Sequence, residues 1–380
     1  MRADAGYLIS GGLGGLGLAL ADWLAERGAR HLLLLGRSAP SSAAREQLAT
    51  LARRGVTVRI AAVDVADETG LRRALEVWRR EGGPDVRGVV HAAGVWRDLP
   101  MAQMSAEDLS TVLAPKVAGT LALERCVGAD LDFFLSCSSL SAVLPAHGQA
   151  NYAAGNAFLD THAQWRRAQG RPALSINWGP WSGIGFGASE HGRRAHERLE
   201  SFGLRRIAPA PALAALGALL ARSVAQATVV TVDWALLARV DAPLARTALL
   251  TEVAGGLVAP VASAEPLAGL GQRVAAAAPA EQEGLVREGV AEIIARVFRR
   301  PVAELRRDEP LPNLGLDSLM AVEIKNRIRA EFGLDVPLAR FLEGSTADGL
   351  ADFTAAAWTE GAAARAAGGE AAAATEEFTV

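Results

Sequence analysis

The chain has 380 residues, which is enough for one full-sized domain and one small domain. Its residues are 50% hydrophobic and 21% charged, and the net charge is -3, as is ordinary for a soluble globular protein. This balance gives no electrostatic case for a nucleic-acid partner. No run in the sequence approaches the roughly 18 apolar residues that a membrane span needs.

Cysteine usage and the N-terminal residues bear on the compartment. The two cysteines, Cys126 and Cys137, cannot form a disulfide framework, and their spacing suits no zinc site. The first residues show no charged-then-apolar leader for export. We therefore expect a cytoplasmic protein with no metal and no membrane partner.

Short apolar runs alternate with amphipathic stretches from residue 7 to residue 234. Each run ends near Gly, Ser or Asp without strict polar alternation, which is typical of parallel strands covered on both faces. The runs are 7–10, 31–36, 56–63, 87–94, 132–139, 173–179 and 228–234, and the predicted helices are 15–28, 41–54, 67–81, 105–127 and 151–169. This alternation predicts an α/β fold, a doubly wound Rossmann-like parallel sheet, in a domain covering 1–254.

The rest of the chain has a different composition. Residues 255–284 are rich in Ala, Gly and Pro without a sustained period, which predicts a linker. From Leu285 apolar residues recur at helical spacing, and further helices are predicted at 318–332 and 346–358. We expect a small all-α four-helix bundle over 285–360 and a disordered tail over 361–380.

A glycine-rich turn, SGGLGGLG, follows the first predicted strand and precedes the first predicted helix. Gly12, Gly14 and Gly17 give the spacing G-x-G-x-x-G, with Gly15 and Leu16 inside the same turn. Glycines there allow backbone N–H groups to approach a pyrophosphate, which the helix N-terminus stabilises. The strand–turn–helix context favours dinucleotide binding over a turn that merely packs tightly.

The end of the second strand bears on the choice of cofactor. An NAD-specific site usually places an acidic residue there, but this chain has Gly36, Arg37 and Ser38. The planar cationic fork of Arg37 suits a 2′-phosphate, so the sequence favours NADPH. The alternative is a surface arginine in an arginine-rich chain.

Two further segments resemble the short-chain dehydrogenase/reductase superfamily: HAAG at 91–94, and Tyr152 thirteen positions after Ser139. That superfamily usually has a lysine four residues after the tyrosine, where this chain has Asn156. Modular polyketide synthase ketoreductases exchange the two roles, and Lys116 stands in the matching place on the preceding long helix. The chain resembles that family across residues 5–236, in segments such as LLLLGRS, LAPKVAGT and SINWGPW.

The resemblance implies roles for individual residues. Tyr152 would donate a proton to the substrate carbonyl and Ser139 a second hydrogen bond, supported by Lys116 and Asn156. The residues implied to border the cofactor, besides the glycine-rich turn and Arg37, are Asp64, Val65, Ala92 and Ala93. A mobile lid is expected after Trp181, with its hinge freedom supplied by Gly183, Gly185 and Gly187.

The segment NLGLDSLM resembles the attachment motif of acyl carrier proteins. Ser318 opens a predicted helix after a long loop, 301–316, and Glu323 follows on that helix. The alternative is that Ser318 is a helix cap and nothing more. The resemblance implies 4′-phosphopantetheine on Ser318, whose thiol arm presents a tethered acyl chain at high effective concentration.

Together these features predict NADPH-dependent reduction of a carrier-bound β-ketoacyl thioester in polyketide or fatty-acid biosynthesis. The expected partners are an acyl thioester, a phosphopantetheinyl transferase and other polyketide synthase domains. One rival is a catalytically silent reductase scaffold beside a working carrier. Another is a free-standing dehydrogenase of a different alcohol, which the fused carrier disfavours.

Two weaker expectations follow from the resemblance. Many ketoreductases that give the D-hydroxy product carry Leu-Asp-Asp shortly after HAAG, and here the corresponding stretch is Trp96, Arg97 and Asp98, so only the final Asp is kept. The absence of Trp at Leu144 and the presence of Gln149 before the tyrosine favour the D-hydroxy product. The family normally carries a structural half before the catalytic half, and the resemblance here begins at residue 5. We therefore expect self-association or an upstream partner that supplies the structural half.

Overall fold

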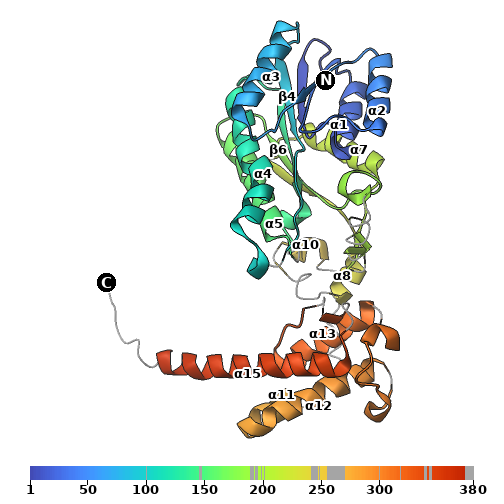
Figure 1. Ribbon diagram of the computed structural model, residues 1–380, viewed down its shortest axis with the longest axis vertical. Helices are drawn as coiled ribbons and strands as arrows, with labels where there is room; N and C mark the ends of the chain where they lie inside the picture. The colour runs from blue at the N-terminus through green and yellow to red at the C-terminus, as the bar shows by residue number, and fades with distance from the viewer. Residues whose placement is uncertain are drawn as a thin grey trace. The chain divides into compact units, whose positions relative to one another are not determined.

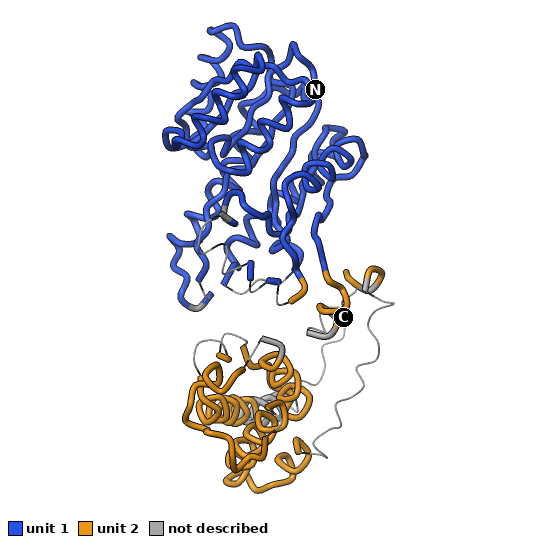
Figure 2. Tube along the Cα trace, turned by 90° about the vertical axis from the view of Figure 1, so that its right-hand side faces the viewer, with its two compact units in different colours: residues 1–200, 204–232 blue, residues 201–203, 233–380 orange. Residues whose placement is uncertain are grey.

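The computed structural model describes residues 1–99, 101–144, 148–188, 192, 196, 197, 199, 200, 202–240, 247, 249–254, 270–298, 300–316, 318–337, 340, 341 and 345–372. The chain divides into two compact units (Figure 2): residues 1–200 with 204–232, and residues 201–203 with 233–380. Among the described residues, none of the helices is both long and apolar enough to cross a membrane.

The first unit is built on a seven-stranded parallel sheet. From edge to edge its strands are β3 (Thr57–Ala62), β2 (His31–Gly36), β1 (Gly6–Ser10), β4 (Val86–His91), β5 (Phe133–Ser139), β6 (Leu174–Trp178) and β8 (Gln226–Val229). The order reverses between β1 and β4, where doubly wound folds bind their ligands. The predicted Rossmann-like fold is confirmed.

Helices cover both faces of this sheet (Figure 1). One face carries α1 (Gly15–Glu26), α2 (Ser42–Arg53) and α7 (Pro209–Leu220), and the other carries α3 (Glu68–Arg80), α4 (Ala106–Cys126) and α5 (Ala150–Ala168). Successive strand residues point to opposite faces, so Ile9 packs against the first group of helices and Leu8 against the second. Both are fully buried, which explains the continuous apolar runs in the sequence.

Local capping explains where several helices begin. Ser41 and Asp67 accept hydrogen bonds from backbone N–H groups at the starts of α2 and α3, and Ser105 forms a capping box with Asp108 at the start of α4. Each such cap stabilises a helix by about 1 kcal/mol. The predicted bounds of these helices agree with the structure to within one residue at each end.

Smaller elements modify the end of this unit. The predicted strand 228–234 is divided between β8 and β9 (Thr231–Val232), and β9 pairs antiparallel with β7 (Leu204–Arg205). The short 3-10 helices are η1 (Met101–Gln103), η2 (Leu140–Ala142) and η3 (Gly185–Ala188).

The described part of the second unit is helical, as predicted. Its elements are α8 (Trp234–Val240), α10 (Thr251–Ala254), α11 (Leu270–Ala276), α12 (Pro279–Val297), η4 (Val302–Glu304), η5 (Leu311–Leu314), α13 (Ser318–Phe332) and α15 (Ala347–Ala372). Its core centres on fully buried side chains such as Ile293, Ile324 and Phe341. Within a helix such as α12, the buried residues Val286, Val290 and Ile293 recur three or four positions apart, so the helix contributes one buried face.

Three boundaries differ from the sequence prediction. Residues 233–254, which are predicted to belong to the first domain (1–254), are part of the second unit. Leu270 and Val274 of α11 are buried in the helical core, although they fall within the predicted linker 255–284, whose first part, 255–269, lies outside the described residues. Their one-turn spacing is hard to recognise in a segment rich in Ala, Gly and Pro, because it comprises only two large apolar residues. Residues 361–372 continue α15 where disorder is expected, because an Ala-rich composition that offers little to bury is also strongly helix-forming. Residues 373–380 lie outside the described residues.

Candidate functional site

The glycine-rich turn joins β1 to α1 in a conformation that excludes side chains. Gly11 has a φ of +66°, and a Cβ on Gly17 would lie 2.2 Å from the Gly11 carbonyl oxygen. A Cβ on Gly12 would lie 2.8 Å from the Ile9 carbonyl oxygen. Gly14 is the N-cap of α1 and offers no side-chain cap, so the first N–H groups of the helix are not covered by a side chain. The turn is therefore shaped as a cradle for an anionic group.

A cavity of about 820 Å³ opens at the carboxyl ends of the parallel strands. The sequence-predicted residues that line it are Gly14, Gly15, Leu16, Gly17, Arg37, Asp64, Val65, Ala92, Ala93, Lys116, Ser139 and Tyr152. Gly12 does not line it, because it packs against Leu34 of the sheet. Asn156 is fully buried beyond the wall of the cavity. Seven segments of the chain thus converge on one site.

Arg37 and Asp64 lie at the end of the cavity formed by β2 and β3. The Arg37 Nη1 atom is 3.9 Å from the Asp64 Oδ2 atom, and both side chains are largely exposed. Asp64 also accepts a hydrogen bond from the Ala66 N–H at 2.9 Å, which fixes its direction. A phosphate placed here would meet a cation and a nearby carboxylate together.

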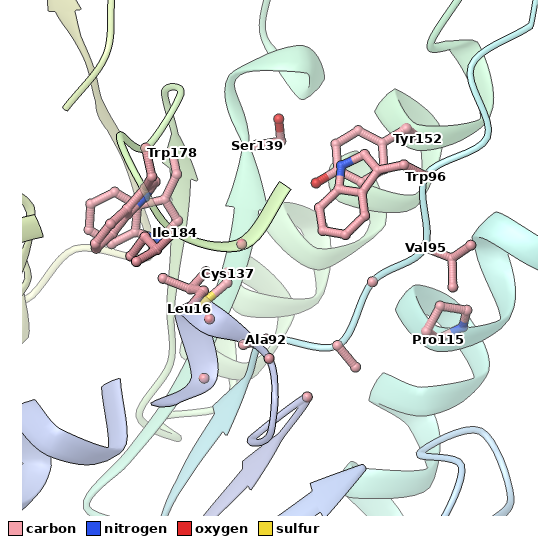
Figure 3. A pocket seen from close by; sticks show the side chains of 18 of the residues that line it. Leu16, Ala92, Val95, Trp96, Pro115, Cys137, Ser139, Tyr152, Trp178 and Ile184 are labelled. Carbon is pink, nitrogen blue, oxygen red and sulfur yellow. The ribbon is translucent and has the colours of Figure 1, made fainter. Parts of the chain in front are cut away.

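Tyr152 lies in the first turn of α5 and is 9% exposed. Its hydroxyl points into the cavity toward the strand that carries Ser139 (Figure 3). Burial raises the pKa of Tyr152 to about 12, and hydrogen bonds with the side chains of Asn156, Trp96 and Ser139 oppose that rise. The hydroxyl is therefore protonated at neutral pH and can donate to an acceptor in the cavity.

Lys116 projects from the middle of α4 toward Tyr152 and is 3% exposed. Its ammonium donates to the Cys137 carbonyl at 2.9 Å and lies 5.8 Å from the centre of the Tyr152 ring. Burial lowers the pKa of Lys116 to about 8. The close approach of α4 to α5 requires Gly155, since a Cβ there would lie 3.2 Å from the Lys116 side chain.

Asn156 follows Tyr152 by one turn of α5. Its side-chain Nδ2 atom donates to the backbone carbonyl of Tyr152 at 2.8 Å, and its backbone carbonyl accepts from the Ser138 hydroxyl at 3.2 Å. The described part of the chain offers no hydrogen-bond partner to its buried Oδ1 atom. Buried acceptors of this kind usually bond to water or to a bound group.

Ser139 ends β5, and its side chain lies near the Tyr152 hydroxyl (Figure 3). Its hydroxyl oxygen accepts from the Ser141 N–H at 3.2 Å and from the Ser141 hydroxyl at 3.1 Å. The proton of the Ser139 hydroxyl is not used in these bonds. The site therefore holds two hydroxyl donors on facing elements, which suits polarisation of a carbonyl oxygen.

In the second unit, Ser318 is the first residue of α13. Asp317 lies outside the described residues, and nothing is described of the Ser318 side chain. The preceding 3-10 helix ends at Gly315, whose φ of +94° turns the chain toward α13. Glu323 is on the same helix and pairs with Arg327 at 2.8 Å.

Comparison with known proteins agrees with both sites. Residues 5–183 match the family described as KR domain, and residues 288–354 match the family described as phosphopantetheine attachment site. A phenolphthiocerol/phthiocerol polyketide synthase of Mycobacterium tuberculosis is 38% identical over 367 residues, covering 93% of this chain and 19% of that protein. The chain therefore joins a ketoreductase domain to a phosphopantetheine attachment domain, and the relatives that share both are polyketide synthases.

Another relative covers a similar share of this chain. The lovastatin diketide synthase of Monascus pilosus is 33% identical over 372 residues, covering 91% of this chain and 14% of that protein. The chain therefore spans less than a fifth of the length of these curated relatives.

Solved ketoreductases share the fold of the first unit. The ketoreductase from the first module of phoslactomycin biosynthesis in Streptomyces sp. HK803 is 40% identical, with a TM-score of 0.57, covering 62% of this chain and 54% of that one. An A1-type ketoreductase is 34% identical, with a TM-score of 0.61, covering 67% and 54%. The ketoreductase domain and the carrier domain that the sequence indicates are confirmed.

Trp96 also lines the cavity of this ketoreductase domain, with its ring centre 5.8 Å from that of Tyr152. From the sequence, Trp96 enters only through the comparison of residues 96–98 with Leu-Asp-Asp, which bears on product stereochemistry and does not place its ring against Tyr152. Gly185 of the expected lid also reaches the site, where a Cβ on Gly15 would lie 2.5 Å from the Gly185 nitrogen. Much of the segment after Ala188 lies outside the described residues.

Proposed function

We propose that the ketoreductase domain uses NADPH to reduce a carrier-bound β-ketoacyl thioester to the β-hydroxyacyl thioester. The observation that carries this proposal is the convergence of Tyr152, Ser139 and the glycine-rich cradle on one cavity. A reductase needs a proton donor, a second hydrogen bond to the carbonyl and a dinucleotide in one place.

The residues present fit a dinucleotide. A Cβ on Gly11, Gly12 or Gly17 would lie less than 3.0 Å from neighbouring backbone atoms, so the turn can follow its tight path only with glycine at these positions. The turn would hold the pyrophosphate, and Arg37 would hold the 2′-phosphate that distinguishes NADPH. The buried Oδ1 atom of Asn156 is an acceptor that suits a ribose hydroxyl or a bound water. When bound, NADPH supplies the hydride that the substrate carbonyl carbon accepts.

The chain's own residues manage the proton and the charge. Tyr152 and Ser139 donate hydrogen bonds to the carbonyl oxygen, and the Tyr152 proton moves to that oxygen as it becomes a hydroxyl. The Lys116 ammonium, 5.8 Å from the phenol ring, stabilises the phenolate that remains. The balance is one hydride at carbon and one proton at oxygen for each carbonyl reduced.

The carrier domain would hold the substrate on 4′-phosphopantetheine at Ser318. A phosphopantetheinyl transferase would join the phosphate of the arm to the serine hydroxyl oxygen, breaking the pyrophosphate bond of coenzyme A and releasing its nucleotide half, adenosine 3′,5′-bisphosphate, and the serine proton. The start of a helix is a suitable place, because the hydroxyl there is not enclosed by the preceding turn of helix. Tethering raises the effective concentration of the acyl chain at the reductase.

A turnover assay separates this function from a silent scaffold. The acetoacetyl thioester of N-acetylcysteamine and NADPH should give steady oxidation of NADPH with formation of the β-hydroxy thioester. A chain that binds NADPH but leaves the thioester unchanged would support the alternative of a catalytically silent scaffold.

The product is expected to be the D-hydroxy isomer. Chiral chromatography that gives mainly the L isomer would contradict this expectation.

A further inference from the structure

Trp96 lies directly against the proton donor. Its ring plane is tilted by 34° from that of Tyr152, and Figure 3 shows the indole nitrogen beside the Tyr152 hydroxyl. The two side chains are hydrogen-bonded. An indole N–H can only donate, so the Tyr152 oxygen is the acceptor.

The loop that carries Trp96 is fixed to the helix that carries Tyr152. Three hydrogen bonds join the residues after Trp96 to those before Tyr152: Asn151 Nδ2 to the Arg97 carbonyl at 3.0 Å, Gln149 Nε2 to Asp98 Oδ2 at 3.0 Å, and the Leu99 N–H to the Gly148 carbonyl at 2.9 Å. Arg97 also pairs with Asp108 of α4. Trp96 and Tyr152 are therefore held at a set separation by their own backbones.

This arrangement has two consequences for chemistry. Because the Tyr152 oxygen accepts from the indole, its own proton is directed away from Trp96, into the cavity. Trp96 also lines the cavity, and its partly exposed ring lies beside the Tyr152 hydroxyl, to which the carbonyl oxygen would bind in the proposed reaction. With the carbonyl bound there, a branch on the next carbon would approach the indole.

We propose that Trp96 is a positioning and specificity-determining residue of the reductase site. It orients the Tyr152 hydroxyl and restricts the substrate to β-ketoacyl thioesters that are unbranched next to the reacting carbonyl. The inference rests on the proposed function and names the substrate class of that same site.

Two variants separate the indole N–H from the ring. Trp96→Phe keeps a ring and loses the donor, whereas Trp96→Leu loses both. Turnover of the acetoacetyl thioester should fall by roughly 3- to 10-fold in both variants, the scale of one lost hydrogen bond. Relative to it, kcat/KM for the α-methyl acetoacetyl thioester should rise by about 10-fold or more in Trp96→Leu only. Equal discrimination between the two thioesters in wild type and Trp96→Leu would overturn the specificity role.

A spectroscopic test of the contact does not depend on turnover. The indole N–H resonance of Trp96, one of 8 tryptophans, is assigned by its loss in Trp96→Phe. In Tyr152→Phe this resonance should shift while the N–H resonances of distant tryptophans stay in place, and an unmoved Trp96 signal would overturn the positioning role. If wild type shows no turnover but the Trp96 signal responds, the proposed function fails and the contact stands.

Discussion

The two functional sites of this chain are built in different ways. The reductase site gathers residues from the ends of β1, β2, β3, β4 and β5 and from α4 and α5, and its central side chains, Tyr152 and Lys116, are buried. The carrier site is one residue, Ser318, at the start of α13. A reaction that needs several groups at one point depends on packing between distant segments, whereas covalent attachment needs one accessible hydroxyl. The two sites should therefore fail independently.

The largest expected effect is at the carrier. Ser318→Ala should abolish loading by a phosphopantetheinyl transferase with coenzyme A, because the attacking oxygen is removed. Ser345→Ala, which changes the other serine of residues 285–360, is the matched control and should load fully. Intact-mass measurement decides the assignment, and an arm that persists in Ser318→Ala would mean that another residue is modified.

Tyr152→Phe tests the reductase site, as Ser318→Ala tests the carrier site. Turnover should fall by about 10²–10⁴-fold, the usual scale for a lost general acid. Loading of the carrier should be unchanged. The matched control is Tyr7→Phe, which alters the chain's other tyrosine, a buried residue whose hydroxyl lies 2.6 Å from the Arg2 nitrogen. Comparable loss in both variants would point to damage of the fold rather than of the proton donor.

The same contrast explains what the sequence could predict. The bounds of α4 follow from the local signals at Ser105 and Asp108, and the attachment serine from a contiguous motif. The convergence of Lys116 with Tyr152 was reached only through a family resemblance, because nothing local brings α4 to α5. The contact between Trp96 and Tyr152 has no local signal in the sequence, since it depends on hydrogen bonds between the loop of Trp96 and the start of α5. Leu270 and Val274 were missed because the Ala-rich surroundings hide a two-residue apolar face.

Lys116→Met tests the cost of burying a charge. The folded-state pKa, about 8, lies below the ordinary value of 10.5, so between these values the folded chain holds fewer protons than the unfolded chain. The free energy of unfolding of the wild type therefore rises with pH across this window, and at lower pH the buried ammonium costs on the order of 3 kcal/mol. Lys116→Met should be the more stable protein near neutral pH, with its advantage shrinking toward about pH 10.

Lys116→Met should lower the activity although it raises the stability. Lys116→Met removes the cation beside the phenolate, and turnover should fall by about 10²-fold. Urea denaturation and steady-state rates measured on the same preparations show whether stability and activity separate. The control is Lys325→Met, the other lysine, which pairs with Asp335 at 3.1 Å on the surface of the carrier domain. A loss of both stability and activity in Lys116→Met would show that the ammonium contributes to the fold.

Substitution of Arg37 should have the smallest effect on the reductase, because the Arg37 side chain is exposed whereas Tyr152 and Lys116 are buried. Its side chain is 63% exposed and that of Asp64 is 46% exposed, so water screens their interaction with each other and with a phosphate. Arg37→Ala should raise the KM for NADPH by about 10-fold, the scale of one exposed charge-assisted hydrogen bond, and leave the KM for NADH unchanged.

Asp64 sharpens this test because it acts on the phosphate with the opposite sign. The Asp64 carboxylate lies 3.9 Å from Arg37 Nη1, so it would compete with a 2′-phosphate for the guanidinium and would repel the phosphate. Asp64→Asn should therefore lower the KM for NADPH relative to NADH, while Arg53→Ala, at an exposed position on α2, should change neither. If Arg37→Ala weakens the two cofactors equally, the guanidinium serves the part of the dinucleotide that they share, and the preference for NADPH must come from elsewhere in the cavity.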